Sequence, residues 1–238
     1  MQAKKLMVTA VAALFSLSTF AQTVDELVDK HVAALGGADK LAGVKTLVTE
    51  RSLSINGMDI PMKVSVVVGK SMRSESSVMG NAMVQVVDGS TGWMIRPSMM
   101  GGTGDPEDMP AEVVKQQAGE LDPFPLFGYK EKGSQIELLG KEKVDRKDTY
   151  HLKVTTPAGQ VVEQYLDATT YLISKVKVTT MDGQPGELFY SDYKDIEGIK
   201  FPKIIEIAGG QMGTLTFVND KIKVNVPVDE KLFKKSSR

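Results

Sequence analysis

The sequence predicts a mainly β protein, in which one large, curled antiparallel sheet forms a half-open barrel around an N-terminal helix and a short helical cover. About a dozen strand-like runs, separated by turn residues such as glycine, asparagine and aspartate, predict the sheet. A sheet with that many strands must curl, and its concave side must be covered by apolar groups. Two segments are available for this, an amphipathic helix near residue 24 and residues 97–128, where the strand pattern is interrupted.

The first 21 residues have the pattern of a secretory signal peptide. Lys4 and Lys5 precede an apolar stretch at residues 6–15, and the segment ends at the small residue Ala21. The apolar stretch is too short for a stable membrane span, since a membrane helix needs about 20 apolar residues. We therefore expect cleavage after Ala21, export to the periplasm, and a single domain over residues 22–238.

The composition narrows the classes of partner. The net charge of −1 becomes −3 once Lys4 and Lys5 are removed, so electrostatics gives no reason to expect nucleic acid as a partner. The chain has no cysteine, which excludes disulfides, thiolate chemistry and a lipidated cysteine. We expect a monomer that is stabilised by its core alone.

The predicted N-terminal helix begins with a capping box. In the run from Thr23 to Glu26, the threonine hydroxyl and the glutamate carboxylate can each satisfy a free backbone N–H group. Gly36-Gly37 ends the helix near Leu35, and a second short helical turn is expected at residues 38–42. The apolar stripe of the helix consists of Val24, Leu27, Val28, His31 and Leu35.

Alternating apolar and polar residues predict an antiparallel meander in the first half of the chain. Its strands are expected at residues 45–55, 58–68, 71–79, 83–87 and 93–96. One side of the first strand presents Leu47, Thr49, Arg51, Leu53 and Ile55. Turn residues separate the strands at Asn56-Gly57, Gly69, Gly80-Asn81 and Asp88-Gly89.

The turn at Asp88-Gly89 is a strong hairpin signal, because both residue types tolerate the positive φ of tight turns. Trp93, the only tryptophan, follows it directly. We expect this strand at the rim of the concave side, where Trp93 either contacts a ligand or anchors the hairpin in the core.

Residues 97–128 are expected to form a cover that packs on the sheet, because loops of this length in compact domains are usually functional. Pro110 suits the first position of a helical piece at residues 110–118. The acidic residues Asp105, Glu107 and Asp108 lack the ligand spacing of a calcium loop, so we expect a solvated loop and no metal. The apolar residues of the cover are Met109, Val113, Val114, Leu121, Phe124, Leu126 and Phe127.

The second half of the chain returns to strands. They are expected at residues 135–139, 149–156, 160–166, 171–179, 187–193, 203–208, 213–219 and 221–226. Turn signals lie at residues 157–159, 182–183, 197–198, 209–210 and 219–220.

Five local patterns resemble the periplasmic lipoprotein carriers of the LolA type and their relatives among the lipoprotein-sorting proteins of Gram-negative bacteria. The clearest is the Val-x-Asp-Gly-x-x-x-Trp hairpin, which ends here at Trp93 and is followed by Pro97. Together the patterns extend over the mature chain. The other four patterns lie at residues 68–73, 165–172, 193–202 and 228–233.

The resemblance implies an antiparallel sheet wrapped around helices, with an apolar cavity that shields the acyl chains of a lipoprotein. It implies a lipidated protein or lipid as ligand, membrane-bound donor and acceptor proteins, and no cofactor. A single basic residue near the cavity mouth helps to control lid closure in such carriers, and Lys70 and Arg73 are the candidates here. The expected ligand-binding residues are Leu53, Ile55, Met62, Val64, Met72, Met83, Trp93, Ile95, Met99, Met100, Met109, Val113, Phe124 and Phe127.

No pattern in the sequence points to catalysis. His31 and His151 have no partner at a spacing that suggests a metal site or a proton relay, and neither a nucleophile elbow nor a phosphate-binding loop is present. The main hypothesis is therefore a carrier that works by burial and handover, without covalent chemistry. The alternative is an envelope assembly or scaffold protein that uses the same fold for a protein partner.

Overall fold

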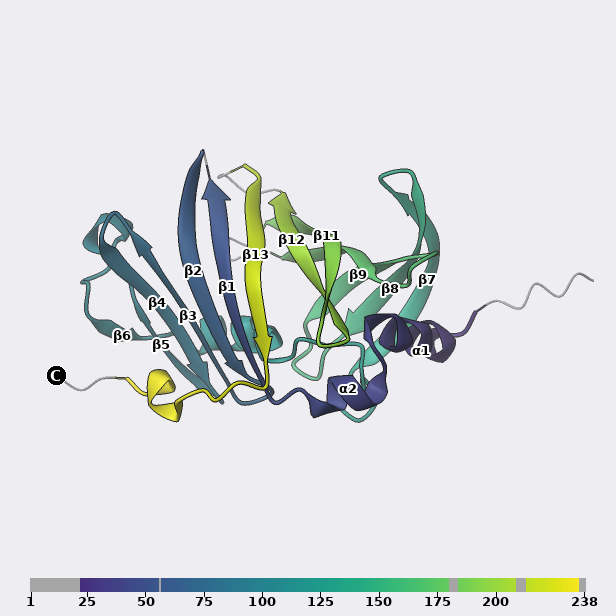
Figure 1. Cartoon of the computed structure of the whole chain (residues 1–238), viewed down its shortest axis with the longest axis horizontal. Coiled ribbons are helices and arrows are strands. Elements are labelled where there is room, and N and C mark those ends of the chain that lie inside the picture. The colour runs from purple at the N-terminus through teal and green to yellow at the C-terminus, as the bar shows by residue number, and fades with distance from the viewer. Residues whose placement is uncertain (1–21, 56, 180–183, 209–212, 236–238) are drawn as a thin grey trace, which may run out of the picture.

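The structure is a computed structural model, which describes residues 22–55, 57–179, 184–208 and 213–235. Within these ranges, thirteen antiparallel strands form one open sheet (Figure 1), which confirms the predicted mainly β fold. The predicted signal peptide and the turns expected at residues 182–183 and 209–210 lie outside the described residues, as does Asn56. The strand order along the sheet is β6-β5-β4-β3-β2-β1-β13-β12-β11-β10-β9-β8-β7.

The strands agree closely with the sequence prediction in the first half of the chain and less closely in the second. The first half contains β1 (Thr46–Ile55), β2 (Met58–Val67), β3 (Ser71–Val78), β4 (Asn81–Asp88), β5 (Thr91–Ile95) and β6 (Pro106–Asp108). The second half contains β7 (Gln135–Val144), β8 (Lys147–Thr155), β9 (Val161–Asp167), β10 (Ile173–Thr179), β11 (Pro185–Ile196), β12 (Ile199–Ala208) and β13 (Leu215–Val224).

Two details of the predicted strands are wrong. The residues predicted as separate strands at 213–219 and 221–226 form the single strand β13, which absorbs Asp220 as an irregularity in its register with β1. The acidic run predicted as a solvated loop contains β6, a short edge strand paired with β5. A bulge in the first case and a three-residue edge strand in the second leave little signal in a sequence.

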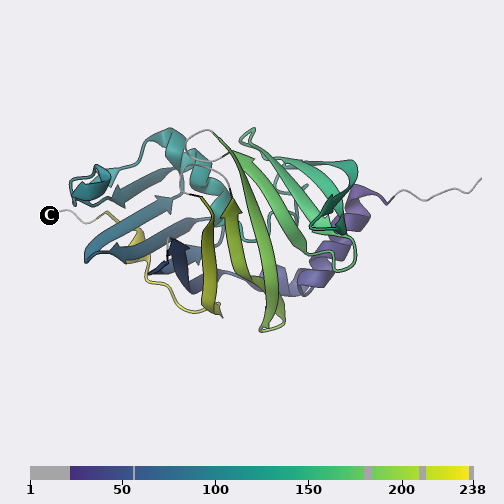
Figure 2. The same ribbon diagram turned by 90° about the horizontal axis from the view of Figure 1, so that it is seen from above.

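The two halves of the sheet meet where the first strand pairs with the last. Leu47 on β1 lies opposite Val224 on β13 and Val66 on β2, so the middle of the sheet is made by segments far apart in sequence. The free edges are β6 and β7, at opposite ends of the molecule (Figures 1 and 2). The sheet curls between them without closing.

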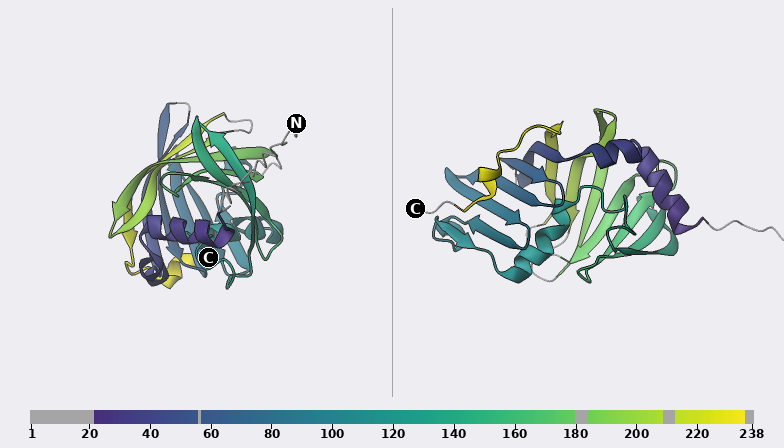
Figure 3. Two further views of the ribbon diagram at one scale, coloured as in Figure 1. Left: turned by 90° about the vertical axis from the view of Figure 1, so that its right-hand side faces the viewer. Right: turned by 90° about the horizontal axis from the view of Figure 1, so that it is seen from below.

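The helix α1 (Val24–Leu35) lies across the open side of the curled sheet (Figure 3). Both hydrogen bonds of the predicted capping box are present, and Gly36 ends the helix with a φ of 136°. A side chain at Gly36 would collide with the carbonyl group of Gly198, in the turn between β11 and β12. Glycine therefore lets the end of α1 pack directly on the sheet. The helix α2 (Ala38–Gly43) follows and leads into β1.

The predicted cover segment, residues 97–128, contains three short helical turns. These are η1 (Ser98–Met100), α3 (Ala111–Gln117) and η2 (Ala118–Leu121). Gly69 N–H, in the turn between β2 and β3, donates a hydrogen bond of 2.9 Å to the Leu121 carbonyl oxygen. The cover segment is thereby tied to the sheet at the base of the meander.

Apolar side chains are buried on both faces of the sheet. The inner face, which α1 and the cover segment contact, carries the main core with Leu47, Val64 and Leu152. The outer face carries a smaller cluster in which Trp93 packs against Phe233 of η3 (Glu230–Phe233). The C-terminal segment thus covers the outer face of the predicted hairpin.

Candidate functional site

A cavity of about 390 Å³ lies on the inner face of the sheet, between β1, β12 and β13 on one side and α1 and the cover segment on the other. We call it the main cavity because it lies against the middle of the sheet, where β1 pairs with β13. Its volume lies within the range of about 300–1,000 Å³ typical of small-molecule sites. Apolar lining residues include Leu35, Leu47, Val64, Phe124, Phe201, Ile205 and Ile222.

Two further hollows, of about 470 and 570 Å³, adjoin the main cavity. Gly119 and Pro125 of the cover segment line all three spaces, and Glu120 lines two of them. The cover segment therefore divides the inside of the curled sheet into compartments. Displacement of residues 119–125 would join these compartments into one larger trough.

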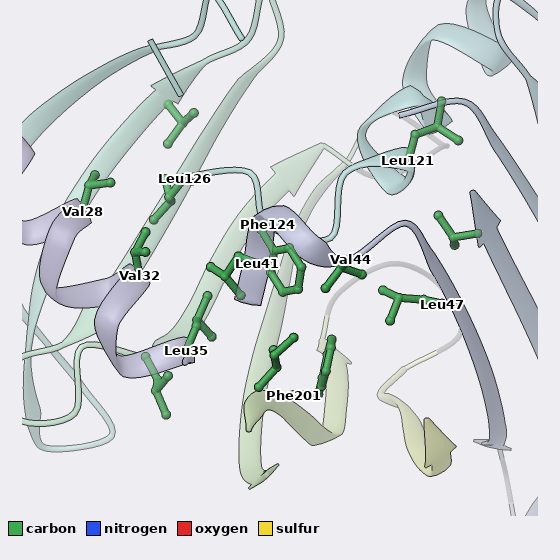
Figure 4. Close-up of a cluster of buried hydrophobic side chains, with 14 of the residues drawn as sticks. Val28, Val32, Leu35, Leu41, Val44, Leu47, Leu121, Phe124, Leu126 and Phe201 are labelled. Atoms are coloured by element: carbon green, nitrogen blue, oxygen red, sulfur yellow. The ribbon is translucent and has the colours of Figure 1, made fainter. Parts of the chain in front are cut away.

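Phe124 is the apolar wedge of the cover segment. Its side chain is only 5% exposed, and its ring centroid lies 5.9 Å from that of Phe201 on β12. Figure 4 shows Phe124 descending from the cover segment toward Leu41, Val44 and Phe201. Phe124 thus separates the main cavity from the 470 Å³ hollow.

Ionic and backbone contacts hold this part of the cover segment in place. The Asp122 carboxylate accepts hydrogen bonds from the Phe124 N–H group at 3.0 Å and from Lys132 Nζ at 2.7 Å. Lys132 Nζ also donates to the Phe124 carbonyl oxygen at 2.9 Å. These bonds are local and accessible to solvent, so they fix the wedge without burying a salt bridge.

Polar side chains also enter the main cavity, which is unusual for an otherwise apolar space. Arg51 from β1, Gln164 from β9, Tyr190 from β11 and Asn219 from β13 line it, together with Glu120 from η2. Among the described residues, no partner is present for the buried polar atoms Arg51 Nε, Gln164 Oε1 and Asn219 Oδ1. These groups give the cavity a polar end.

The enclosed setting shifts the ionisation of several lining groups. Glu120 is exposed, but desolvation by the protein groups around its carboxyl group raises the pKa of that group, and the nearby charge of Arg51 opposes this change. Burial, aided by Glu120, raises the pKa of Tyr190 to about 12, and burial likewise raises the pKa of Tyr193. Both phenols therefore stay neutral at physiological pH.

His31 closes the cavity from the side of α1. It is 2% exposed, and its Nδ1 atom lies 2.8 Å from the Tyr171 carbonyl oxygen. Burial lowers the pKa of His31 more than this hydrogen bond raises it. The imidazole is therefore neutral at physiological pH and acts as a structural donor to the turn before β10.

Three of the residues predicted to bind ligand line the hollows. Val64 and Phe124 line the main cavity, and Phe127 lines the adjoining hollow with Phe124. A second group lies on the inner face outside these spaces. By strand alternation and register it comprises Leu53 and Ile55 on β1, Met62 opposite Arg51 on β2, and Met83 on β4.

The other predicted ligand-binding residues lie elsewhere. Met72 and Met109 are buried in the main core, with Val113 packed against it. Met99 and Met100 are more than half exposed on η1. The structure therefore brings together only part of the set predicted to bind ligand. Trp93 and Ile95 belong to the cluster on the outer face.

Trp93 and both predicted gating residues contact the C-terminal segment on the outer face. Trp93 Nε1 donates to the Phe233 carbonyl oxygen at 2.9 Å. Arg73 donates to the Leu232 carbonyl oxygen at 3.0 Å, and Lys70 pairs with Glu230 at 2.6 Å. Gly69, which precedes Lys70, donates its backbone N–H to the Leu121 carbonyl oxygen of the cover segment.

The polar end of the main cavity is absent from the sequence prediction, although one signal for it was present. Arg51 alternates with Leu47, Thr49 and Leu53 on one side of the predicted first strand. A charged residue within an apolar stripe is either at an exposed end or directed into a cavity. Gln164 gives a similar signal between Val162 and Leu166 on β9.

No helix in the described part of the chain has the length and apolarity that a membrane crossing requires.

Solved structures share this architecture, while neither a family model nor a curated protein matches the sequence. A LolA superfamily protein from Nitrosomonas europaea aligns with a TM-score of 0.60 and 14% identity, over 90% of this chain and 99% of that one. A domain assigned to the outer membrane lipoprotein-sorting proteins, from Vibrio parahaemolyticus, gives 0.55 and 14%, over 88% and 95%. A DUF1329 family protein from Desulfovibrio piger gives 0.51 and 15%, over 89% and 97%. At these identities the likeness is one of fold.

Proposed function

We propose, from the LolA-like fold that this chain has, that the protein is a periplasmic carrier for the acyl group of a lipoprotein or another apolar ligand. It binds the ligand in the trough of the curled sheet and hands it on without covalent chemistry. The observation that carries the proposal is the main cavity, a largely apolar space of about 390 Å³ beneath the cover segment.

Burial alone supplies enough free energy for such a carrier. Each CH₂ group transferred from water to an apolar space contributes about 0.8 kcal/mol. A chain of about 15 such groups would contribute up to roughly 12 kcal/mol before the cost of association is subtracted. A chain of that length needs more room than the main cavity offers, so its entry would displace residues 119–125 and join the adjoining hollows.

The proposed release step is movement of the cover segment. Opening would break the Gly69–Leu121 hydrogen bond and withdraw Phe124 from Phe201. Lys70 flanks that hydrogen bond and binds Glu230 of the C-terminal segment, so a membrane-bound donor or acceptor protein that engages this segment would act on the cover through the turn at residues 69–70. Arg73 would act in the same way through Leu232.

The same proposal includes the cellular location and the oligomeric state of the carrier. The sequence of residues 1–21 supports cleavage and export to the periplasm, and the remaining residues 22–238 would act as one monomeric domain. Membrane-bound proteins would load and unload it. Two structural neighbours, a LolA superfamily protein and a lipoprotein-sorting domain, support this proposal.

A matched pair of variants on β12 tests the proposal. Ile205 lines the main cavity, whereas the adjacent Ile204 points to the opposite face of the strand. Ile205→Trp should fill the cavity and abolish saturable binding of a fluorescent acyl probe, while Ile204→Trp should leave binding unchanged. Equal binding by both variants would contradict a cavity site and favour the scaffold alternative, in which the cover's own Leu121, Phe124 and Leu126 fill the trough.

A further inference from the structure

The main cavity contains the cationic side chain of Arg51. Arg51 Nε is buried and forms no hydrogen bond within the described ranges, and no ion pair joins the Arg51 guanidinium to a carboxylate there. The guanidinium lies over the ring of Phe217, whose centroid is 4.9 Å from Arg51 Cζ. Arg51 as a whole is half-buried, but a charged group whose polar atoms are withdrawn from water is normally paired, because burial of an unpaired charge is costly.

Two unpartnered acceptors face the same space. Gln164 is 5% exposed, and its Oε1 atom has no partner in the described part of the molecule. Asn219 lies directly opposite Arg51 across β1 and β13; it donates through Nδ2 to the Pro202 carbonyl oxygen at 2.8 Å, but its Oδ1 atom is unpartnered. Native proteins leave few buried polar atoms unsatisfied. All three of these side chains line one cavity, so a polar group of a ligand that enters it can supply the missing partners.

Resting on the proposed carrier function, we infer that Arg51 anchors the anionic head group of an acyl ligand inside the main cavity. The head group carries an acidic oxygen, of a carboxylate or a phosphate, which accepts from the guanidinium. Gln164 Oε1 and Asn219 Oδ1 accept from hydroxyl or N–H donors of the same head group. The acyl chain then lies along the apolar wall formed by Leu35, Val64 and Phe124.

Glu120 is the internal competitor of such a ligand. It comes from η2 of the cover segment, lines the main cavity, and carries the charge that couples electrostatically to Arg51. No hydrogen bond joins the two side chains, so Glu120 attracts Arg51 electrostatically but leaves the Arg51 Nε–H group without an acceptor. A ligand anion that binds Arg51 would replace this attraction and loosen the cover. Neutralisation of Glu120 should therefore strengthen anion binding.

Three probes of equal chain length separate the head group from the chain. Tetradecanoate, tetradecyl phosphate and tetradecanol are titrated against the full mature protein. The wild type should bind at least one anion about 10-fold or more tightly than the alcohol, the ratio expected for one hydrogen bond to a charged group. The relative affinities of the two anions identify the acidic head group that the site prefers.

Variants of Arg51 and Glu120 should change the affinity for the anionic probes in opposite directions. Arg51→Met should remove the preference for the anion and leave alcohol binding unchanged, whereas Arg51→Lys should keep part of it. Glu120→Gln should tighten anion binding severalfold with no change for the alcohol. Lys221 is an exposed cation on β13 that points away from the cavity, because its neighbour Ile222 lines it. Lys221→Met is therefore the control for net charge and should have little effect.

The outcomes distinguish this inference from the carrier proposal. Failure of all three probes to bind would overturn the carrier function itself. Tight alcohol binding without a preference for either anion would overturn the anchor alone. Equal losses in Arg51→Met and Lys221→Met would also overturn it, because the effect would then be one of general charge. If Arg51→Met does not fold, a tightening of anion binding in Glu120→Gln supports the anchor, and no change contradicts it.

Discussion

The wedge residue Phe124 allows stability and ligand capacity to be separated. In Phe124→Ala the ring that packs 5.9 Å from Phe201 is removed, and the main cavity joins the 470 Å³ hollow. Substitution of a buried phenylalanine by alanine costs about 3–5 kcal/mol. Phe124 is 5% exposed but already borders two hollows, so some of its packing contacts are missing and we expect the lower limit, about 3 kcal/mol.

A loss of about 3 kcal/mol corresponds to a fall in Tm of roughly 6–12 °C for a chain of this size. Urea and thermal unfolding measure this, with Phe127→Ala as the control, because Phe127 is only partly buried. Binding of a branched or two-chain acyl probe should be retained or improved despite the lower stability. A stability loss below about 1 kcal/mol would refute the packing of Phe124 in the trough. Loss of the bulky probe in a folded variant would refute its role as a partition.

Three further predictions concern titration and the outer face. Burial holds the pKa of His31 in the folded protein below 6.5, so the unfolded chain takes up a proton first as the pH falls. The free energy of unfolding should therefore decrease below about pH 6.5. His31→Gln should flatten this part of a stability–pH curve measured by urea unfolding. Hydrogen bonds from Lys234 and Ser71 hold the pKa of Asp88 below 3.8, so the ionised carboxylate stabilises the fold at neutral pH. This stabilisation is lost as the pH falls through the folded-state pKa of Asp88. In the same assay, Asp88→Asn should lack this stabilisation and lose less stability than the wild type below about pH 4. Trp93 lies on the outer face, so its fluorescence should not change when an acyl ligand fills the main cavity; a large shift would contradict that placement.

Local signals in the sequence predicted much of the fold. The capping box at Thr23 and the turn at Asp88-Gly89 appear where expected, because both depend on residues close together in the chain. The merger of two predicted strands into β13 was missed because Asn219-Asp220 has turn composition, yet pairing with β1 carries the chain straight through it. Tertiary pairing outweighed local preference there.

The residues of the candidate site were harder to predict from the sequence than the fold. Both faces of β4 and β5 carry apolar residues, so alternation alone could not say which face looks into the trough. The outer face is apolar because Phe233, about 140 residues further along the chain, packs against Trp93. The register of the strands determines which face looks into the trough, and the structure shows that Val64 and Arg51 line the main cavity whereas Trp93 does not.

The most direct test of the carrier proposal is the content of the cavity after gentle isolation. The mature protein, purified from the periplasm without detergent, is analysed by native mass spectrometry and by lipid extraction. We predict an acyl ligand in near-stoichiometric amount that is absent from Ile205→Trp and present in Ile204→Trp. A wild-type protein that is empty of acyl ligand, and that takes up no acyl probe afterwards, would contradict the proposed function.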